Sequence, residues 1–208
     1  MITIRGFSKH YDNRLILAIP SLDLNPGVTW VKGENGAGKT TLFKSLAGII
    51  PCEGDITVNN ISLTKDPIGY RLRVNYSEAE PLYPTFLTAK DLVRFVGKAK
   101  RATIDQQDRY CEALGVNEYF TKACGTYSSG MLKKLSLAMA FLGNPELIIL
   151  DEPLVTLDER SRNSLLELVK EKTEVKDPIT ILLSSHQMLD PVILSIDRML
   201  EIKNGGIA

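Results

Sequence analysis

The chain has 208 residues, of which 25 are basic and 25 acidic, so its formal net charge is zero. This length suffices for one α/β domain with a full core. The balanced charge argues against binding of nucleic acid or anionic lipid through the overall charge of the protein. Cys52, Cys111 and Cys124 lack C-x-x-C spacing, which suits a reducing cytosol and disfavours disulfides or a zinc site. We find no secretory signal, and apolar runs such as 147–150 fall far below the ~20 residues that cross a bilayer, so a membrane role requires a partner.

The first third of the chain reads as short strands around a glycine-rich turn. Strands are expected around Ile2 to Phe7, at 15–19 and at 56–58, joined by short turns as in an antiparallel sheet. Between them, residues 28–31 read as a buried strand, and residues 41–47 read as a helix that ends at Gly48.

The remaining chain alternates helical and strand patterns. Residues 85–126 are expected to be mostly helical, with helices at 89–100 and 105–114, as a subdomain inserted into the core. A helix at 129–142, a strand at 147–150, a helix at 159–172, a strand at 180–183 and a short tail follow. Such alternation predicts an α/β fold with a mostly parallel sheet, an N-terminal antiparallel β lobe and an inserted helical subdomain.

The segment from Gly33 to Thr40, GENGAGKT, fits the phosphate-loop pattern G-x-x-x-x-G-K-[ST] between a predicted strand and a predicted helix. That order places backbone N–H groups and the positive end of a helix dipole around a polyphosphate. Lys39 is expected to neutralise the β and γ oxygens, and the Thr40 hydroxyl is expected to ligate Mg²⁺. The sequence therefore predicts a nucleoside triphosphate site.

A second motif places two carboxylates at the end of the predicted strand 147–150. Asp151 and Glu152 follow four consecutive apolar residues, a pattern typical of a strand buried on both faces. Because ligands lie beyond the carboxyl ends of such strands, both acids are expected beside the phosphate loop. We expect Asp151 to hold Mg²⁺ and Glu152 to polarise the water that attacks the γ-phosphate.

Two further groups are expected near phosphate. Ser128 and Gly130 stand at the start of a predicted helix, which suits a second anion site, although an ordinary N-cap is the simpler interpretation of either alone. His186 follows the predicted strand 180–183, so we expect it at the same sheet edge, directed toward the γ-phosphate.

With these motifs in order, the chain resembles the ATP-binding cassette family, the nucleotide-binding subunits of ABC transporters, over essentially its whole length. The resemblance identifies 33–40 as Walker A, 127–131 as the signature, 147–152 as Walker B with its catalytic acid, and 157–158 as the D-loop. It implies a single ATPase domain over 1–208, with a helical subdomain at about 85–130. It also implies that Tyr11 stacks on adenine, although a packed tyrosine at a strand end is an alternative.

The resemblance implies a full set of site residues, with ATP and Mg²⁺ as cofactors. Glu152 and His186 are expected to be catalytic, and Thr40 and Asp151 to bind the metal. The expected nucleotide-binding residues are Tyr11, Gly33, Asn35, Gly36, Ala37, Gly38, Lys39, Thr40, Thr41, Ser128, Gly130 and Asp158.

The resemblance further implies partners. Two cassettes, identical or different, would face head to tail, each ATP lying between one Walker A and the other subunit's signature, with Asp158 linking the sites. Closure and hydrolysis would drive membrane-spanning permease subunits, placing the chain in the cytoplasm on the inner face of the membrane; no nucleic-acid partner is expected. The chain stops at Ala208, soon after the last predicted core strand, as short exporter cassettes do, which favours export; cargo is chosen by the permease.

The chain departs from the family pattern in two places. In the signature, usually Leu-Ser-Gly-Gly-Gln, Tyr127 replaces leucine, Ser129 the first glycine and Met131 glutamine. In the loop where the family places a glutamine, Ala79 stands instead, and Glu78 or Glu80 is a candidate to contact metal or water. Two alternatives stay open: a soluble single-cassette ATPase that assembles metal clusters or acts as a switch, and a weakly hydrolysing partner subunit, against which Glu152 and His186 argue.

Overall fold

Five parallel strands form the centre of the structure, a computed structural model that describes residues 1–185 and 194–208. The sheet has the order β10-β9-β3-β8-β7-β6. Its strands are β3 (Gly27–Lys32), β6 (Val74–Ser77), β7 (Leu147–Leu150), β8 (Thr180–Ser184), β9 (Arg198–Lys203) and the antiparallel edge strand β10 (Gly206–Ile207). Ser77 pairs with Leu150, and Leu150 with Leu183, so three strands end at the same level. The segments that follow them therefore meet at one edge, as predicted.

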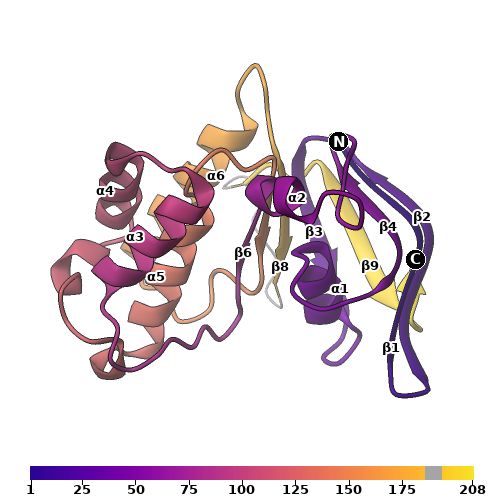
Figure 1. Cartoon of the computed structure of the whole chain (residues 1–208), viewed down its shortest axis with the longest axis horizontal. Coiled ribbons are helices and arrows are strands. Elements are labelled where there is room, and N and C mark those ends of the chain that lie inside the picture. The colour runs from indigo at the N-terminus through magenta and orange to yellow at the C-terminus, as the bar shows by residue number, and fades with distance from the viewer. Residues whose placement is uncertain (186–193) are drawn as a thin grey trace.

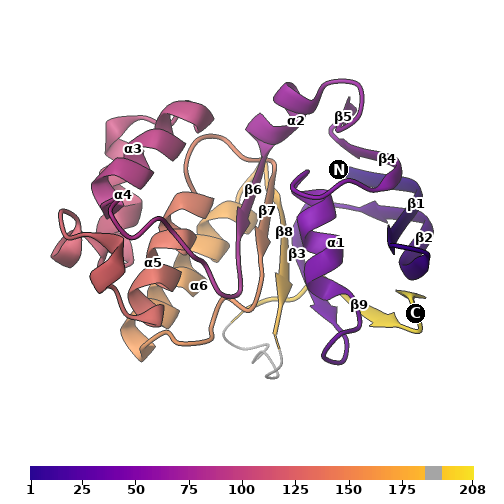
Figure 2. The same ribbon diagram turned by 60° about the horizontal axis from the view of Figure 1, so that its bottom comes forward.

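The N-terminal strands form the second, antiparallel sheet that the sequence predicts. Its order is β2 (Arg14–Leu24), β1 (Ile2–Tyr11), β4 (Glu53–Val58) and β5 (Ile61–Ser62). Alternate residues of β1, such as Ile2 and Ile4, are buried, because successive side chains of a strand point to opposite faces. They pack with α1 (Lys39–Leu46) and one face of the central sheet in a common core. In Figure 2, α1 stands between the two sheets.

The helical lobe is inserted between β6 and β7 and lies apart from the antiparallel sheet in Figure 1. It contains α3 (Ala89–Lys100), α4 (Ile104–Ala113), the start of α5 (Ser129–Ala140) and the short 3-10 helices Val116–Tyr119 and Cys124–Thr126. Thr88 and Thr103 begin α3 and α4 with capping boxes, in which side chain and backbone satisfy each other's free groups. The lobe shares a core with α6 (Glu159–Thr173) and the other face of the central sheet.

The short tail expected after β8 is wrong, because β9 and β10 extend the sheet there. Leu200 and Ile202 alternate with exposed residues in β9, which pairs in parallel with β3. The helix α2 (Pro67–Arg73) was not predicted; Asp66 caps its first turn by accepting from the Gly69 N–H. The helix expected at 129–142 ends at Ala140.

Candidate functional site

The glycine loop between β3 and α1 lies at the carboxyl edge of the central sheet. Gly36 and Gly38 have φ angles of +79° and +108°, a region that glycine enters without steric cost. Lys39 begins α1, is 8% exposed, and its Nζ donates to the carbonyls of Gly33 at 2.7 Å and Glu34 at 3.1 Å. The N–H groups of the first helical turn favour an anion at this point.

Three hydroxyl groups surround the carboxylate of Asp151, which is 1% exposed at the end of β7. Thr40 donates to Oδ2 and Ser184 to Oδ1, each at 2.7 Å, and the Tyr76 hydroxyl donates to Oδ2 at 3.3 Å. Burial, followed by the charge of Asp151, raises the pKa of Tyr76 well above its ordinary value, so the phenol stays protonated and donates. Thr40 and Asp151 thus bring together oxygen ligands of the kind that Mg²⁺ prefers.

The peptide bond between Asp151 and Glu152 is held from both sides. Its N–H, on Glu152, donates to Ser184 Oγ at 2.9 Å, and its carbonyl, on Asp151, accepts from Lys133 Nζ at 2.6 Å. Glu152 has a φ of +45°, which residues other than glycine seldom adopt. Neither Lys133 nor Ser184 was predicted to have a role. For Lys133, the one signal in the sequence was its position among the apolar residues of the helix that follows the signature.

One cavity of about 530 Å³ joins the phosphate loop to the two acids, a size within the range of small-molecule sites. Tyr11 contributes a ring that is 48% exposed, with Lys9 Nζ 4.8 Å from its centre. Nine residues predicted for the site line the cavity: Tyr11, Asn35, Gly36, Gly38, Lys39, Thr40, Thr41, Asp151 and Glu152. Gly33 and Ala37 belong to the same loop.

The two acids of the loop that follows β6, Glu78 and Glu80, line different cavities. Ala79 and Glu80 line the nucleotide-sized cavity, whereas the Glu78 carboxylate lies 3.6 Å from Lys44 and lines a different cavity. Of the two acids considered as replacements for the missing glutamine, Glu80 is the one that faces the phosphate loop and Asp151.

Two residues of the predicted signature and D-loop are helix caps. Ser128 caps α5 by accepting from the Met131 N–H at 3.2 Å, and Asp158 caps α6 and forms an ion pair with Lys134. A side chain at Gly130 would meet the Thr156 carbonyl at 2.9 Å. Among the described residues that line the 530 Å³ cavity, Ser128, Gly130 and Asp158 are absent. His186 lies outside the described residues.

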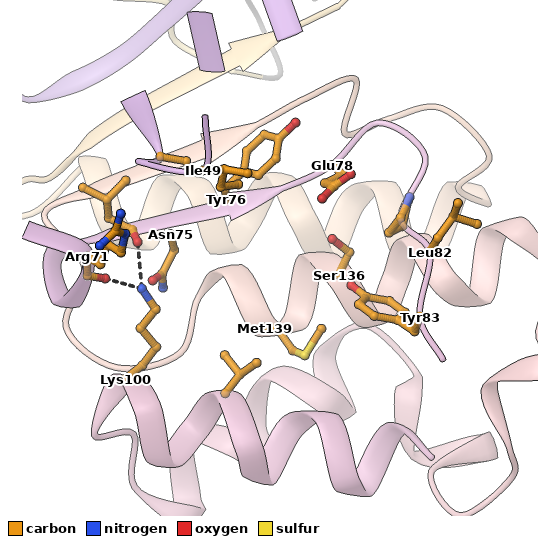
Figure 3. Close-up of a pocket in the computed structure, with 14 residues that line it drawn as sticks. Ile49, Arg71, Asn75, Tyr76, Glu78, Leu82, Tyr83, Lys100, Ser136 and Met139 are labelled. Carbon is orange, nitrogen blue, oxygen red and sulfur yellow. Dashed lines mark hydrogen bonds between the residues drawn. The ribbon is translucent and has the colours of Figure 1, made fainter. Parts of the chain in front are cut away.

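A second cavity, of about 300 Å³, lies where the helical lobe meets β6 and the end of α1. We call it the interlobe groove; Figure 3 shows Ser136 and Tyr83 at one end and Lys100 at the other. Lys100 donates to the backbone carbonyls of Arg71 and Val74, the latter at 2.8 Å. Burial, and then the charge of Arg71, lowers the pKa of Lys100 to about 8.

The parallel sheet with a glycine loop before α1 defines a phosphate-loop fold. A buried lysine, a pair of oxygen groups suited to Mg²⁺ and a second acid share one of its cavities. The family model described as ABC transporter matches residues 17–155. A second model, described as AAA domain, putative AbiEii toxin, Type IV TA system, matches residues 123–189. The chain therefore belongs to the ABC transporter family and carries its ATP-binding domain.

Curated relatives and solved structures agree. The chain is 32% identical to linearmycin resistance ATP-binding protein LnrL of Bacillus subtilis over 90% of its length, and spans 62% of that protein. It is 31% identical to ABC transporter ATP-binding protein NatA of the same organism, covering 100% of this chain and 87% of the relative. An ATP-binding subunit of an ABC transporter superposes with a TM-score of 0.88 at 25% identity, covering 100% and 88% of the two chains. A dimeric cassette bound to ADP and phosphate shares the fold, with a TM-score of 0.82 at 21% identity over 100% and 96%.

No helix within residues 1–185 and 194–208 is both long enough and apolar enough to span a membrane.

Proposed function

We propose that the chain hydrolyses ATP with Mg²⁺ and uses the cycle to drive separate membrane-spanning subunits. The observation that carries this proposal is the convergence of Lys39, Asp151 and Glu152 on one cavity. Residues 1–208 then act as one ATPase domain, with residues 85–130 as its helical subdomain.

Each residue has a defined task in this reaction. Lys39 exchanges its carbonyl contacts for the β and γ oxygens of ATP, which it neutralises. Glu152 accepts a proton from the attacking water, and the first turn of α1 binds phosphate through its N–H groups. Thr40 and Asp151 would hold Mg²⁺, since one carboxylate, one hydroxyl and phosphate oxygens suit that ion. When bound, the ion offsets the charge of the phosphates.

A second cassette completes the site. Ser128, Gly130 and Asp158 do not line the cavity of their own chain, which supports a head-to-tail pair in which they approach the partner's nucleotide. The solved dimeric cassette has the same fold. The pair is formed by two copies of this chain or by two related chains, and His186 remains the proposed sensor of the γ-phosphate.

A membrane-spanning permease is the proposed partner at the interlobe groove, which would hold the chain at the inner face of the membrane. Leu82, which lines the groove, is 86% exposed, and Phe95 on α3 is 73% exposed. Such apolar side chains favour a protein contact. Export stays a prediction, because one relative is named for linearmycin resistance and another for thiamine import. Co-purification from detergent extracts tests the partner, and recovery without a multi-span protein would favour a soluble ATPase.

The variant Glu152→Gln tests the catalytic assignment. The amide keeps the size of the side chain, removes its charge near the γ-phosphate and is a poor base. We expect hydrolysis to fall roughly 10²–10⁴-fold, and a closed, ATP-filled dimer to accumulate. Size-exclusion chromatography in Mg-ATP should then show a dimer for the variant and a monomer for the parent. Asp151→Asn is the contrast, because it should weaken Mg²⁺ binding instead. Hydrolysis by Glu152→Gln at the parent rate would refute Glu152 as the base.

A further inference from the structure

The ammonium of Lys133 lies at a junction of three segments. Lys133 lies on α5, five residues after Ser128, and is 1% exposed. Its Nζ donates to the carbonyls of Glu78 at 2.6 Å, Ala79 at 3.3 Å and Asp151 at 2.6 Å. Three N–H donors thus meet three backbone acceptors, so this buried cation is fully hydrogen-bonded.

One of these bonds acts on the peptide that orients the proposed base. Glu152 is held at a φ of +45°, and such a conformation persists when surrounding contacts determine it from several sides. Ser184 Oγ accepts the N–H of this peptide at 2.9 Å while Lys133 binds its carbonyl. Removing the ammonium would leave one side of the peptide unrestrained, and the peptide would be able to rotate.

The other two bonds connect this peptide to a loop that borders both cavities. Ala79 and Glu80 line the nucleotide cavity, while Glu78, Pro81 and Leu82 line the interlobe groove. A shift of this loop changes the position of the Glu78 and Ala79 carbonyls, and therefore the position of the ammonium that binds the Asp151 carbonyl.

We propose that Lys133 is a positioning residue for ATP hydrolysis: it fixes the peptide that aims Glu152 at the γ-phosphate and couples its orientation to the Glu78–Ala79 loop. This inference rests on the proposed ATPase function. Lys133, a residue of α5, would then connect the interlobe groove to the proposed catalytic acid Glu152. Two of the carbonyls lie on the Glu78–Ala79 loop and the third lies on Asp151, so the compact ammonium with three donors suits this point better than the planar fork of arginine.

The test compares Lys133→Met with the parent and with Lys98→Met, which makes the same change at an exposed lysine on α3. We expect Lys133→Met to lower kcat about 10–100-fold, since a misplacement of about 1 Å can cost this much. Affinity for a non-hydrolysable ATP analogue should stay within about threefold, because the phosphate loop is untouched. Lys133→Gln, which retains two donors, should recover part of the rate, and Lys98→Met should match the parent.

A second arm separates positioning from folding. In a Glu152→Gln background, adding Lys133→Met should leave the residual rate unchanged, because the lysine acts through Glu152. Any of three results would overturn the proposal. The rate could fall further in the Glu152→Gln background, kcat and analogue binding could be lost in parallel, or Lys133→Met could turn over ATP at the parental rate. A folded parent that binds but does not hydrolyse Mg-ATP would overturn the proposed function and this inference together, whereas an active parent confines a failure to Lys133.

Discussion

The variant Lys39→Ala should abolish useful ATP binding and leave the protein folded. In the structure, Lys39 Nζ makes two hydrogen bonds, both to loop carbonyls, at 2.7 Å and 3.1 Å. With ATP bound, the ammonium can instead form two charge-assisted bonds to phosphate. Because these bonds replace two existing ones, the loss is better taken from the cost of removing one partner of a buried charge pair, about 2–5 kcal/mol of binding free energy, which weakens the affinity roughly 30–5,000-fold.

The cost to folding should be small. Gly33 is only half-buried and Glu34 is exposed, so water can replace the ammonium at both carbonyls. The variant should therefore unfold within a few degrees of the parent without nucleotide. In saturating Mg²⁺ and a non-hydrolysable ATP analogue, at 100 times its Kd, the parent should gain ~2.7 kcal/mol of stability. For a domain of this size, that corresponds to about 5–10 °C in Tm.

Calorimetric titration and thermal unfolding, each with and without the analogue, measure both quantities. The matched control is Lys44→Ala on the same helix, whose ammonium lies 3.6 Å from Glu78 and does not line the nucleotide cavity. This control should bind the analogue with the affinity of the parent and show the same rise in Tm. A folded Lys39→Ala protein that binds the analogue with parental affinity would refute the assignment of the phosphate loop.

Three further variants test the rest of the site. Tyr11→Ala should weaken ATP binding several-fold and Tyr11→Phe should not, because stacking needs the ring; equal losses in calorimetry would indicate a hydrogen-bonded tyrosine instead. Ser128→Ala should lower turnover without changing the ATP affinity of the monomer, and mixing it with Lys39→Ala should restore some activity, as one composite site is then intact. Asp151→Asn should raise the Mg²⁺ concentration needed for half-maximal turnover, and an unchanged Mg²⁺ titration would remove Asp151 from the metal site.

The parts of the fold that the sequence predicted are those with strong local patterns. The strand at Leu147–Leu150 and the helix at Ala89–Lys100 have the predicted bounds, because an unbroken apolar run and a capped amphipathic repeat each favour one structure. The strand β9 was missed because only Leu200 and Ile202 alternate as buried apolar residues in it, and its partner β3 is far away in the chain. Pairing between distant segments leaves little trace in either segment alone.

The residues of the site also divide into those with a strong local pattern, which were predicted, and those without one, which were missed. Residues with specific chemistry in a fixed pattern, such as Lys39 and Asp151, were predicted to lie together, and the structure brings them to one cavity. Tyr76, Ser184 and Lys133 were missed because their roles depend on hydrogen bonds to groups on other elements. A hydroxyl or a lysine in isolation has many possible partners, so the fold must first select one.

The altered signature shows how structure limits such departures. Ser129 is an exposed residue of the first turn of α5 with an ordinary helical backbone, so a side chain there meets no steric obstacle. The hydroxyl of Tyr127 accepts from the Ala89 N–H at 3.1 Å and donates to the Lys122 carbonyl at 2.8 Å, which joins the signature to two other segments of the helical lobe.

Gly130 is different, because any Cβ would lie 2.9 Å from the Thr156 carbonyl. The signature thus varies where α5 tolerates a side chain and keeps glycine where the segment before the D-loop leaves no room. A substitution at Gly130 would therefore displace that segment along with the signature, so Ser128, whose side chain is exposed, is the sharper probe of contact with a partner's nucleotide.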